Sequence, residues 1–277
     1  MPELPEVEHV ARSLNRLVNG RKIVSSSLNR ERLVPDMTPD EFSTSIAKVV
    51  IDRVHRRGKH ILFELNGGLT LITHLRMSGR FMILQAETED PKFAHAVFHL
   101  DDGTRLVFQD QRHFGMMKIV DTAGLHETKE LAKLAPEPLS NDFSSDYLRA
   151  VLKSSNRSLK EILIDQTKVC GLGNIYAAEV MFLAGAHPKL RARRLSKAKA
   201  HALFEAIGGI LSSAIAHSAR MPVDPENIEQ TYFNGSSGDR WLVYGRENLP
   251  CRTCDTLIVR SKQAGRSSYY CPRCQRR

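Results

Sequence analysis

Four cysteines near the end of the chain have the spacing of a metal site. Two residues separate Cys251 from Cys254, and Cys271 and Cys274 repeat that spacing after an interval of sixteen residues. Two such pairs offer four thiolates to one tetrahedral zinc ion, and a filled coordination shell leaves no position for a reactive water. The pattern predicts one structural Zn²⁺. Disulfides are the alternative, and a reducing compartment disfavours them.

The first residues, MPELPEVE, could carry nucleophilic chemistry. Removal of Met1 would leave Pro2 with a secondary amine, and an α-amino pKa of ~7.7 to 8.0 leaves a useful neutral fraction near pH 7. Attack of this amine on a sugar C1′ leads, after ring opening, to an iminium that acidifies the C2′ proton and permits elimination of the 3′ phosphate. Glu3 could move protons at the ring oxygen or the leaving base, and Glu6 could position the amine. The alternative is a plain helix start, in which carboxylates face the positive end of the dipole.

A second motif, Gly171-Leu172-Gly173-Asn174, opens an expected helix. It lacks the third glycine of a dinucleotide fingerprint, and no alternating strands and helices surround it. Backbone N–H groups at such a helix start can bind a phosphate, and Asn174 adds a side-chain donor.

Between the cysteine pairs, Arg266 follows Gly265 at the expected tip of a hairpin. An exposed arginine there suits a DNA groove, and a solvated surface side chain is the alternative.

Several other residues are ambiguous when each is considered alone. Lys59 follows a glycine at a strand start, where surface charges are common. His74 and Met77 lie in THLRMSGR and would ordinarily be core residues, and Arg112 and Phe114 lie in QDQRHFGMM. Their types alone assign no function.

Composition favours a polyanionic partner. The formal net charge is +9, and residues 251–277 contain seven Lys and Arg against a single acid, Asp255. Nucleic acid, anionic lipid and acidic protein would all fit such a surface. The chain contains no apolar run of the ~18 to 20 residues that cross a bilayer and no signal-peptide pattern, which predicts a cytoplasmic protein.

The elements that must position these residues follow from the hydrophobic period. Apolar residues from Val7 to Val18 have helical spacing and end at Asn19-Gly20. Eight short β-rich runs between residues 22 and 120 predict a β-sandwich or barrel, with hairpin turns at residues 66–68 and 101–103. After residues 134–142 the period becomes helical, and residues 219–240 form a polar segment broken by prolines. We expect a catalytic domain at 1–133, a helical domain at 134–240 and a zinc finger at 241–277.

Taken together, these motifs resemble the formamidopyrimidine-DNA glycosylase family, the bacterial base-excision enzymes with a helix-two-turn-helix domain and a zinc finger. The resemblance covers most of the chain and follows its order: MPELPEVE, RRGK, HLRMSGR, RHFG, LAPEPL, DQTKVCGLGNIYAAEV, VYGR and the finger ending CPRCQ. It implies an α+β protein with an N-terminal β-sandwich, a helical domain and a β-hairpin zinc finger. It also implies a monomer that binds double-stranded DNA containing a damaged base.

The resemblance assigns roles to the candidate residues. Pro2 would be the nucleophile, Glu3 the acid/base, Glu6 a supporting carboxylate, and Lys59 a phosphate contact that assists elimination. Asn174 and Arg266 would grip phosphates flanking the lesion, and His74 would be a further DNA-binding residue. The side chains inserted into the duplex to replace an everted base would be Met77, Arg112 and Phe114.

The resemblance therefore predicts a bifunctional glycosylase and AP lyase that removes oxidised purines, 8-oxoguanine and formamidopyrimidines, and cuts the backbone by β,δ-elimination. The same chemistry on oxidised pyrimidines or abasic sites, or a non-catalytic binder of damaged DNA, are the alternatives. The chain departs from the family at Arg76, where glycine is usual. It departs again in the 219–240 loop, which places Asp224, Glu226 and Gln230 where relatives cover an everted 8-oxoguanine.

Overall fold

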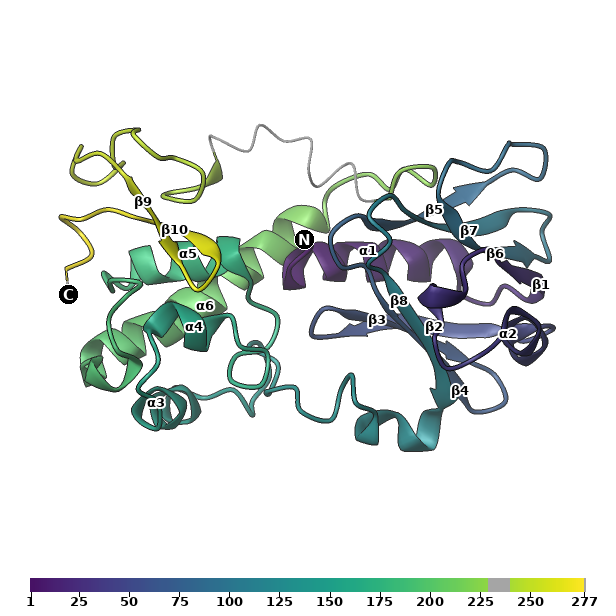
Figure 1. The fold of residues 1–277 in the computed structure, drawn as a ribbon, viewed down its shortest axis with the longest axis horizontal. Coiled ribbons are helices and arrows are strands. Elements are labelled where there is room, and N and C mark those ends of the chain that lie inside the picture. Colours follow the sequence, from purple (N-terminus) through teal and green to yellow (C-terminus); the bar gives the residue numbers. More distant parts are fainter. Residues whose placement is uncertain (229–239, 277) are drawn as a thin grey trace. The chain divides into compact units, whose positions relative to one another are not determined.

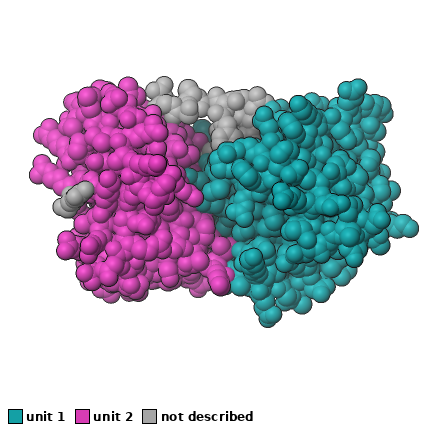
Figure 2. Space-filling model, viewed as in Figure 1, with its two compact units in different colours: residues 1–132, 217–234 teal, residues 133–216, 235–277 magenta. Residues whose placement is uncertain are grey.

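The computed structural model describes residues 1–228 and 240–276, which form two compact units (Figure 2). The first contains residues 1–132 and the described segment from 217 to 228, and the second contains 133–216 and the described segment from 240 onward. Within the described ranges, no helix is long and apolar enough to cross a membrane.

The first unit is a β-sandwich that also contains the α-helices α1 and α2 (Figure 1). One antiparallel sheet has the strand order β2-β3-β4-β8 and the other has the order β1-β6-β7-β5. The bounds are α1 Leu4–Val18, β1 Ile23–Leu28, α2 Pro39–Ile46, β2 Ile51–Arg57, β3 His60–Leu65, β4 Leu69–His74, β5 Gly79–Leu84, β6 Ala94–Leu100, β7 Arg105–Asp110 and β8 Met116–Asp121. The eight predicted strands and the sandwich are confirmed.

Helix α1 forms because its apolar residues recur on one face. Val7, Val10, Leu14 and Val18 are buried in the core of the first unit. The helix begins at Leu4, three residues before the expected start, because Pro5 fits the first turn and Glu3 occupies the N-cap position. The amino terminus therefore lies directly at the start of a helix.

Helix α2 was not predicted, because the sequence suggested only strands in this region. Thr38 caps it by accepting a hydrogen bond from the Glu41 backbone N–H, and the Glu41 carboxylate accepts one from the Thr38 N–H at 2.8 Å. This is a capping box, which a Thr-x-x-Glu spacing can signal. Phe42 and Ile46 anchor the helix in the core.

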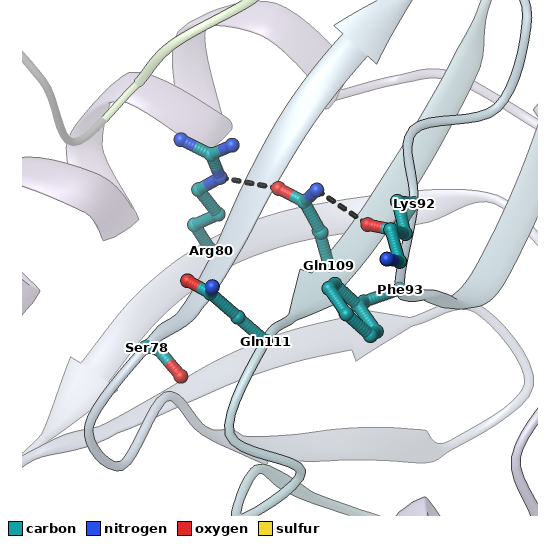
Figure 3. Close-up of a pocket in the computed structure, with 6 residues that line it drawn as sticks. All are labelled: Ser78, Arg80, Lys92, Phe93, Gln109 and Gln111. Atoms are coloured by element: carbon teal, nitrogen blue, oxygen red, sulfur yellow. Dashed lines mark hydrogen bonds between the residues drawn. The ribbon is translucent and has the colours of Figure 1, made fainter.

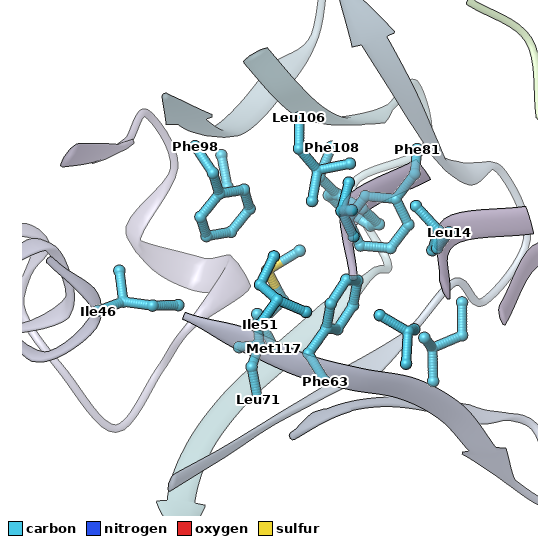
Figure 4. Close-up of a cluster of buried hydrophobic side chains, with 14 of the residues drawn as sticks. Leu14, Ile46, Ile51, Phe63, Leu71, Phe81, Phe98, Leu106, Phe108 and Met117 are labelled. Carbon is cyan, nitrogen blue, oxygen red and sulfur yellow. The ribbon is translucent and has the colours of Figure 1, made fainter. Parts of the chain in front are cut away.

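The sandwich core lies between the two sheets and is rich in aromatic side chains (Figure 4). Phe63 packs on Phe81 with ring centroids 5.4 Å apart, and Phe81 packs on Phe108 at 5.1 Å. Both pairs are edge-to-face, which is the arrangement that aromatic quadrupoles favour. This chain of rings joins the sheets beneath the connections β4–β5 and β7–β8.

The second unit is helical and carries a two-stranded hairpin (Figure 1). Its elements are α3 Ser145–Lys153, α4 Leu159–Leu163, α5 Asn174–Leu183, α6 Lys197–Ser218, β9 Val259–Gln263 and β10 Arg266–Tyr270, and α6 ends two residues inside the first unit. The predicted α+β fold class is thus confirmed. The three-domain division proposed from the sequence stays a prediction.

Candidate active site and metal centre

Two carboxylates are held at the start of α1. The Glu3 backbone N–H donates to Glu6 Oε2 at 2.8 Å, and the Val7 N–H donates to the Glu3 carbonyl at 3.0 Å. Glu3 and Glu6 are 2% and 4% exposed, and Pro2 is buried beside them. Buried carboxylates are stabilised at a helix N-terminus by the dipole and its N–H groups. The fold therefore places both next to the chain's amino group.

The α-amino group of Met1 experiences charges from four side chains. Burial lowers the pKa of this amine, Glu3 and Glu6 raise it, and Lys59 and Arg112 lower it, with a net lowering from the ordinary value. A lowered pKa increases the neutral, nucleophilic fraction at pH 7. The predicted catalytic residues Glu3, Glu6 and Lys59, together with the predicted DNA-binding residue Arg112, thus act on the amino end of the chain.

Lys59 reaches this region through the tight turn between β2 and β3. Arg57 pairs with His60 across the hairpin, so Gly58 and Lys59 form the turn, and Gly58 adopts the left-handed conformation with φ 59°. Arg56 Nε donates to Glu8 Oε2 at 2.6 Å, which joins the end of β2 to α1. Lys59 itself is 5% exposed. The hairpin therefore presents a buried lysine to the start of α1.

His74 ends β4 next to another histidine. Its ring meets that of His60 edge-on at 4.7 Å, and Nδ1 accepts a hydrogen bond from the Arg76 N–H at 2.9 Å. Burial lowers the pKa of His74 to about 2 and that of His60 to about 4. His74 is therefore neutral at pH 7 and supports the turn that carries Met77; its predicted DNA contact stays a prediction.

Met77 and Phe114 are exposed, contrary to the ordinary expectation that such side chains lie in a core. They are 46% and 56% exposed, and the Arg112 guanidinium lies 5.3 Å from the Phe114 ring centroid. Exposed large apolar side chains beside a cation suit contact with stacked bases. Sequence reasoning missed Asp110 and Ser78, which hold these residues, because the motif resemblance assigned them no role.

In the second unit, Asn174 is the first residue of α5. Gly173 is the N-cap, and Gly171 takes φ 83°, which glycine adopts without steric cost. The Oδ1 atom of Asn174 is buried and has no hydrogen-bond partner within the described residues. This oxygen can accept a hydrogen bond from a donor, whereas the backbone N–H groups at the helix start and the Asn174 Nδ2 are the groups that could donate to a phosphate.

Arg266 starts β10 after a two-residue turn in which Ala264 and Gly265 have φ 46° and 74°. This turn geometry matches the twist of a hairpin. Lys160 of α4 supports the hairpin, because its Nζ donates to the Ser267 carbonyl at 2.5 Å and contacts Ser268 Oγ at 2.8 Å. Arg266 remains exposed at the tip. The resemblance did not point to this supporting lysine.

The four predicted cysteines come together at one end of the hairpin. Their sulfur atoms all lie within 4.8 Å of one another, and no disulfide joins them. Sγ–Sγ distances of 3.4 and 3.9 Å join Cys254 to Cys271 and Cys251 to Cys274. Zn–S bonds of about 2.3 Å in a tetrahedron require sulfurs about 3.8 Å apart, so the site fits one structural zinc ion. Cys170 lies elsewhere and is fully buried, as expected.

The predicted loop of residues 219–240 is described only in part. Gln230 lies outside the described residues. Asp224 accepts a hydrogen bond from the Glu226 N–H at 3.0 Å, and the Pro225 carbonyl accepts one from Ile83 of β5 at 2.7 Å. The described part of this segment therefore packs against the sandwich.

Three family models together match most of the chain. The family model for the formamidopyrimidine-DNA glycosylase N-terminal domain matches residues 1–117, that for its H2TH domain matches 134–222, and a zinc finger found in FPG and IleRS matches 248–277. The formamidopyrimidine-DNA glycosylases of Ruegeria pomeroyi and Listeria innocua are 42% and 38% identical over the full length of both chains.

A similar solved structure is the complex between Lactococcus lactis Fpg and DNA containing an abasic site. It has a TM-score of 0.91 and 32% identity, and the match covers 99% of this chain and 100% of that one. The structure of an Fpg mutant bound to DNA containing Fapy-dG matches with the same TM-score and identity. The chain belongs to the formamidopyrimidine-DNA glycosylase family.

Proposed function

We propose that the protein removes oxidised purines from double-stranded DNA and then cleaves the backbone by β,δ-elimination, with the Pro2 amine as nucleophile. The observation that carries this proposal is the cluster at the amino end of the chain. Glu3, Glu6 and Lys59 act electrostatically on the α-amine of Met1, the residue before Pro2, and burial lowers the pKa of that amine. Removal of Met1 would leave the Pro2 amine beside the two buried carboxylates, and a pure DNA-binding protein has no evident use for such an amine.

The chemistry follows from these groups. The lone pair of the Pro2 nitrogen forms a bond to C1′ as the bond from C1′ to the base breaks, and Glu3 moves protons at the leaving base or the ring oxygen. Ring opening then gives an iminium between the proline nitrogen and C1′. Loss of the C2′ proton expels the 3′ phosphate, and a second elimination expels the 5′ phosphate. Lys59 would stabilise a departing phosphate with its positive charge.

DNA binding would use both units. Met77 and Phe114 would fill the space left by the everted nucleotide, and Arg112 would bond the orphaned partner base. Asn174 and Arg266 would bind phosphates, because one lies at a helix N-terminus and the other is an exposed hairpin arginine. The zinc-bound cysteines would hold the hairpin that presents Arg266.

We further propose that the protein acts as a monomer in the bacterial cytoplasm.

Oxidised purines are the leading substrates, because PELPEVE is closer to that branch of the family. The Lactococcus lactis relative has been solved with DNA containing an oxidised pyrimidine as well as Fapy-dG. Pyrimidine lesions are therefore the second candidate, with the same chemistry at the sugar.

Borohydride trapping tests the proposal. Reduction of the iminium converts the proline nitrogen into a stable tertiary amine and leaves the protein covalently bound to DNA. We expect an adduct on duplexes containing 8-oxoguanine or an abasic site. Pro2→Gly should lower trapping strongly, and Glu3→Gln should abolish it on 8-oxoguanine. Glu41→Gln is a matched control, because Glu41 is also a carboxylate in a helix capping box but lies at the start of α2.

The outcomes separate the alternatives. Trapping only on an oxidised pyrimidine would reassign the substrate, and trapping only on the abasic duplex would leave the lyase without the proposed lesion. Tight binding without any adduct would identify a non-catalytic binder of damaged DNA and overturn the proposal.

A further inference from the structure

The exposed side chains that would enter the duplex lie on two neighbouring connections. Residues 75–78 join β4 to β5 and carry Met77, and residues 111–115 join β7 to β8 and carry Arg112 and Phe114. Each connection crosses from one sheet to the other. At their ends Gly79 pairs with Asp110, and His74 pairs with Met116. The strand register therefore places the two crossovers side by side.

A fully buried carboxylate binds both crossovers. Oδ1 of Asp110 accepts hydrogen bonds from Ser78 Oγ at 2.5 Å and from the Arg112 N–H at 3.2 Å. Oδ2 accepts one from the Gly115 N–H at 2.6 Å. The Arg112 N–H also points to Ser78 Oγ at 3.0 Å, so this hydroxyl touches the opposite crossover directly. Ser78 is thus the side chain through which the Met77 crossover joins the Arg112 and Phe114 crossover.

The electrostatics agree with this role. Burial opposes ionisation of Asp110, but the bonds from Ser78 and from the backbone of Gly115, Arg112 and Phe114 outweigh it and lower the pKa of the carboxyl. An ionised acceptor makes each of these bonds stronger than a bond between neutral groups. The link is therefore charged at pH 7.

Close packing beneath the crossovers prevents them from moving independently. A Cβ added at Gly79 would lie 2.8 Å from Phe108 Cζ and 2.5 Å from the Leu75 carbonyl oxygen, and a Cβ at Gly115 would lie 2.7 Å from the same Phe108 atom. Gly79 and Gly115, at the ends of the two crossovers, thus pack against the same Phe108 ring, and neither position has space for a side chain. Protein interiors packed this closely transmit displacement rather than absorb it.

We propose that Ser78 and Asp110 are positioning residues that make the two crossovers insert into DNA as one unit during eversion of the damaged base. The inference rests on the proposed function, because it assigns Met77, Arg112 and Phe114 to the duplex. Eversion leaves a gap that must be filled while the partner base is held. A link that fixes the separation of Met77 from Arg112 and Phe114 before binding lowers the ordering cost of that step.

Ser78 offers a clean test, because it also borders a surface pocket. The pocket is lined by Ser78, Arg80, Lys92, Phe93, Gln109 and Gln111 (Figure 3). Ser78→Ala deletes the hydroxyl and the link. Ser78→Thr keeps the hydroxyl and has the pocket beside it to receive the methyl group. Ser43→Ala is the matched control, because it deletes a partly buried hydroxyl that bonds to the Ser26 carbonyl at 2.9 Å in another part of the unit.

The experiment compares two single-turnover reactions of each variant. Excision of 8-oxoguanine requires unstacking and eversion of a base, whereas a preformed abasic site has no base to unstack. We expect Ser78→Ala to slow excision about tenfold relative to abasic-site cleavage, the size expected for one bond to a charged group. Ser78→Thr should restore the ratio, and Ser43→Ala should leave it unchanged.

A second readout does not depend on catalysis. With 2-aminopurine opposite 8-oxoguanine, insertion unstacks the probe and raises its fluorescence, and Ser78→Ala should slow this rise. If Ser78→Ala left the ratio of the two rates unchanged, the inference would be overturned. Equal slowing of both reactions together with a lower melting temperature would show that the link is merely structural. If the wild-type protein excised nothing but Ser78→Ala still slowed the fluorescence rise, the proposed function would fail and the inference would stand.

Discussion

Arg76 stands in the turn after β4, at a position where glycine is expected from the family resemblance. It has φ 53°, a left-handed conformation that costs an L-residue roughly 1 to 2 kcal/mol and costs glycine almost nothing. The chain tolerates it because the Arg76 N–H bonds to His74 Nδ1 at 2.9 Å. A glycine, as the resemblance leads us to expect here, would adopt this conformation without strain.

Substitutions at Arg76 and Gly79 should change the free energy of unfolding in opposite directions. Arg76→Gly relieves the strain but makes the unfolded chain more flexible, so we expect a small gain of about 0.5 kcal/mol in the free energy of unfolding. Gly79→Ala should lose at least about 2 kcal/mol, because its Cβ would lie 2.5 Å from the Leu75 carbonyl oxygen. Urea unfolding of both variants measures the difference. Destabilisation by Arg76→Gly would show that the arginine side chain makes contacts that outweigh the strain.

Sites built from residue types with a specific chemistry could be predicted from the sequence. The cysteine spacing gave a metal site, and the four sulfurs do converge. Supporting residues such as Asp110, Lys160 and Glu179 could not be predicted from local pattern. Glu179, for example, accepts hydrogen bonds from the backbone N–H groups of residues 242–244, which lie 63 to 65 residues downstream, and such partners are set only by the tertiary fold.

At the scale of elements, the alternation of apolar and polar residues and the turn residues between the runs were sufficient to predict the β-sandwich. Short strands with this alternation, separated by glycine-rich turns, are compatible with few other folds. Helix α2 was not predicted because it is short and lies between strands, where its local signals are the capping box and the proline in its first turn. The long-range pairing of the sheets also could not be predicted. It is this pairing that sets the two crossovers beside each other.

The adjacent strands β3 and β4 should make the sandwich sensitive to acid. The pKa values of His60 and His74 are lowered by burial to about 4 and about 2, whereas unfolded histidines titrate near 6.5. Between pH 6.5 and about 4 the unfolded chain therefore binds protons that the folded chain does not, so stability is present above pH 6.5 and is lost as the pH falls. From pH 7 to 5 each histidine should cost about 2 kcal/mol.

Chemical unfolding at pH 7 and pH 5 measures this loss. His60→Gln, which can keep a hydrogen bond to the Arg57 carbonyl, should make the loss smaller by roughly the 2 kcal/mol assigned to one histidine. His99→Gln, at an exposed position on β6, is the matched control. The same pH dependence in His60→Gln and in the wild type would refute the assignment.

The β9–β10 hairpin should depend on its metal. Purified protein should contain one zinc per chain, and Cys254→Ser should lose the zinc and weaken DNA binding, because a short hairpin has little stability of its own. Cys170→Ala, outside the cluster, should retain the metal. Metal analysis with a DNA-binding titration checks both, and full zinc content in Cys254→Ser would contradict the four-cysteine site.

At the scale of the whole molecule, the net charge of +9 and the basic tail predict binding dominated by phosphate contacts. Each phosphate neutralised on duplex DNA contributes about −0.9 to the slope of log affinity against log salt. Loss of a charged contact should therefore change both the affinity and the slope. Loss of a neutral contact should change the affinity alone.

Arg266 and Asn174 allow this distinction to be measured within one unit. Both are proposed phosphate contacts, but only Arg266 carries a charge that displaces a counterion. Arg266→Gln should weaken binding to a duplex containing an abasic-site analogue and make the salt slope shallower by about 0.9. Asn174→Ala should weaken binding at every salt concentration with the slope unchanged, because a neutral amide releases no counterion. Titrations from low to moderate salt decide between them, and an unchanged slope in Arg266→Gln would remove that residue from the phosphate contacts and leave the hairpin tip without a role in DNA binding.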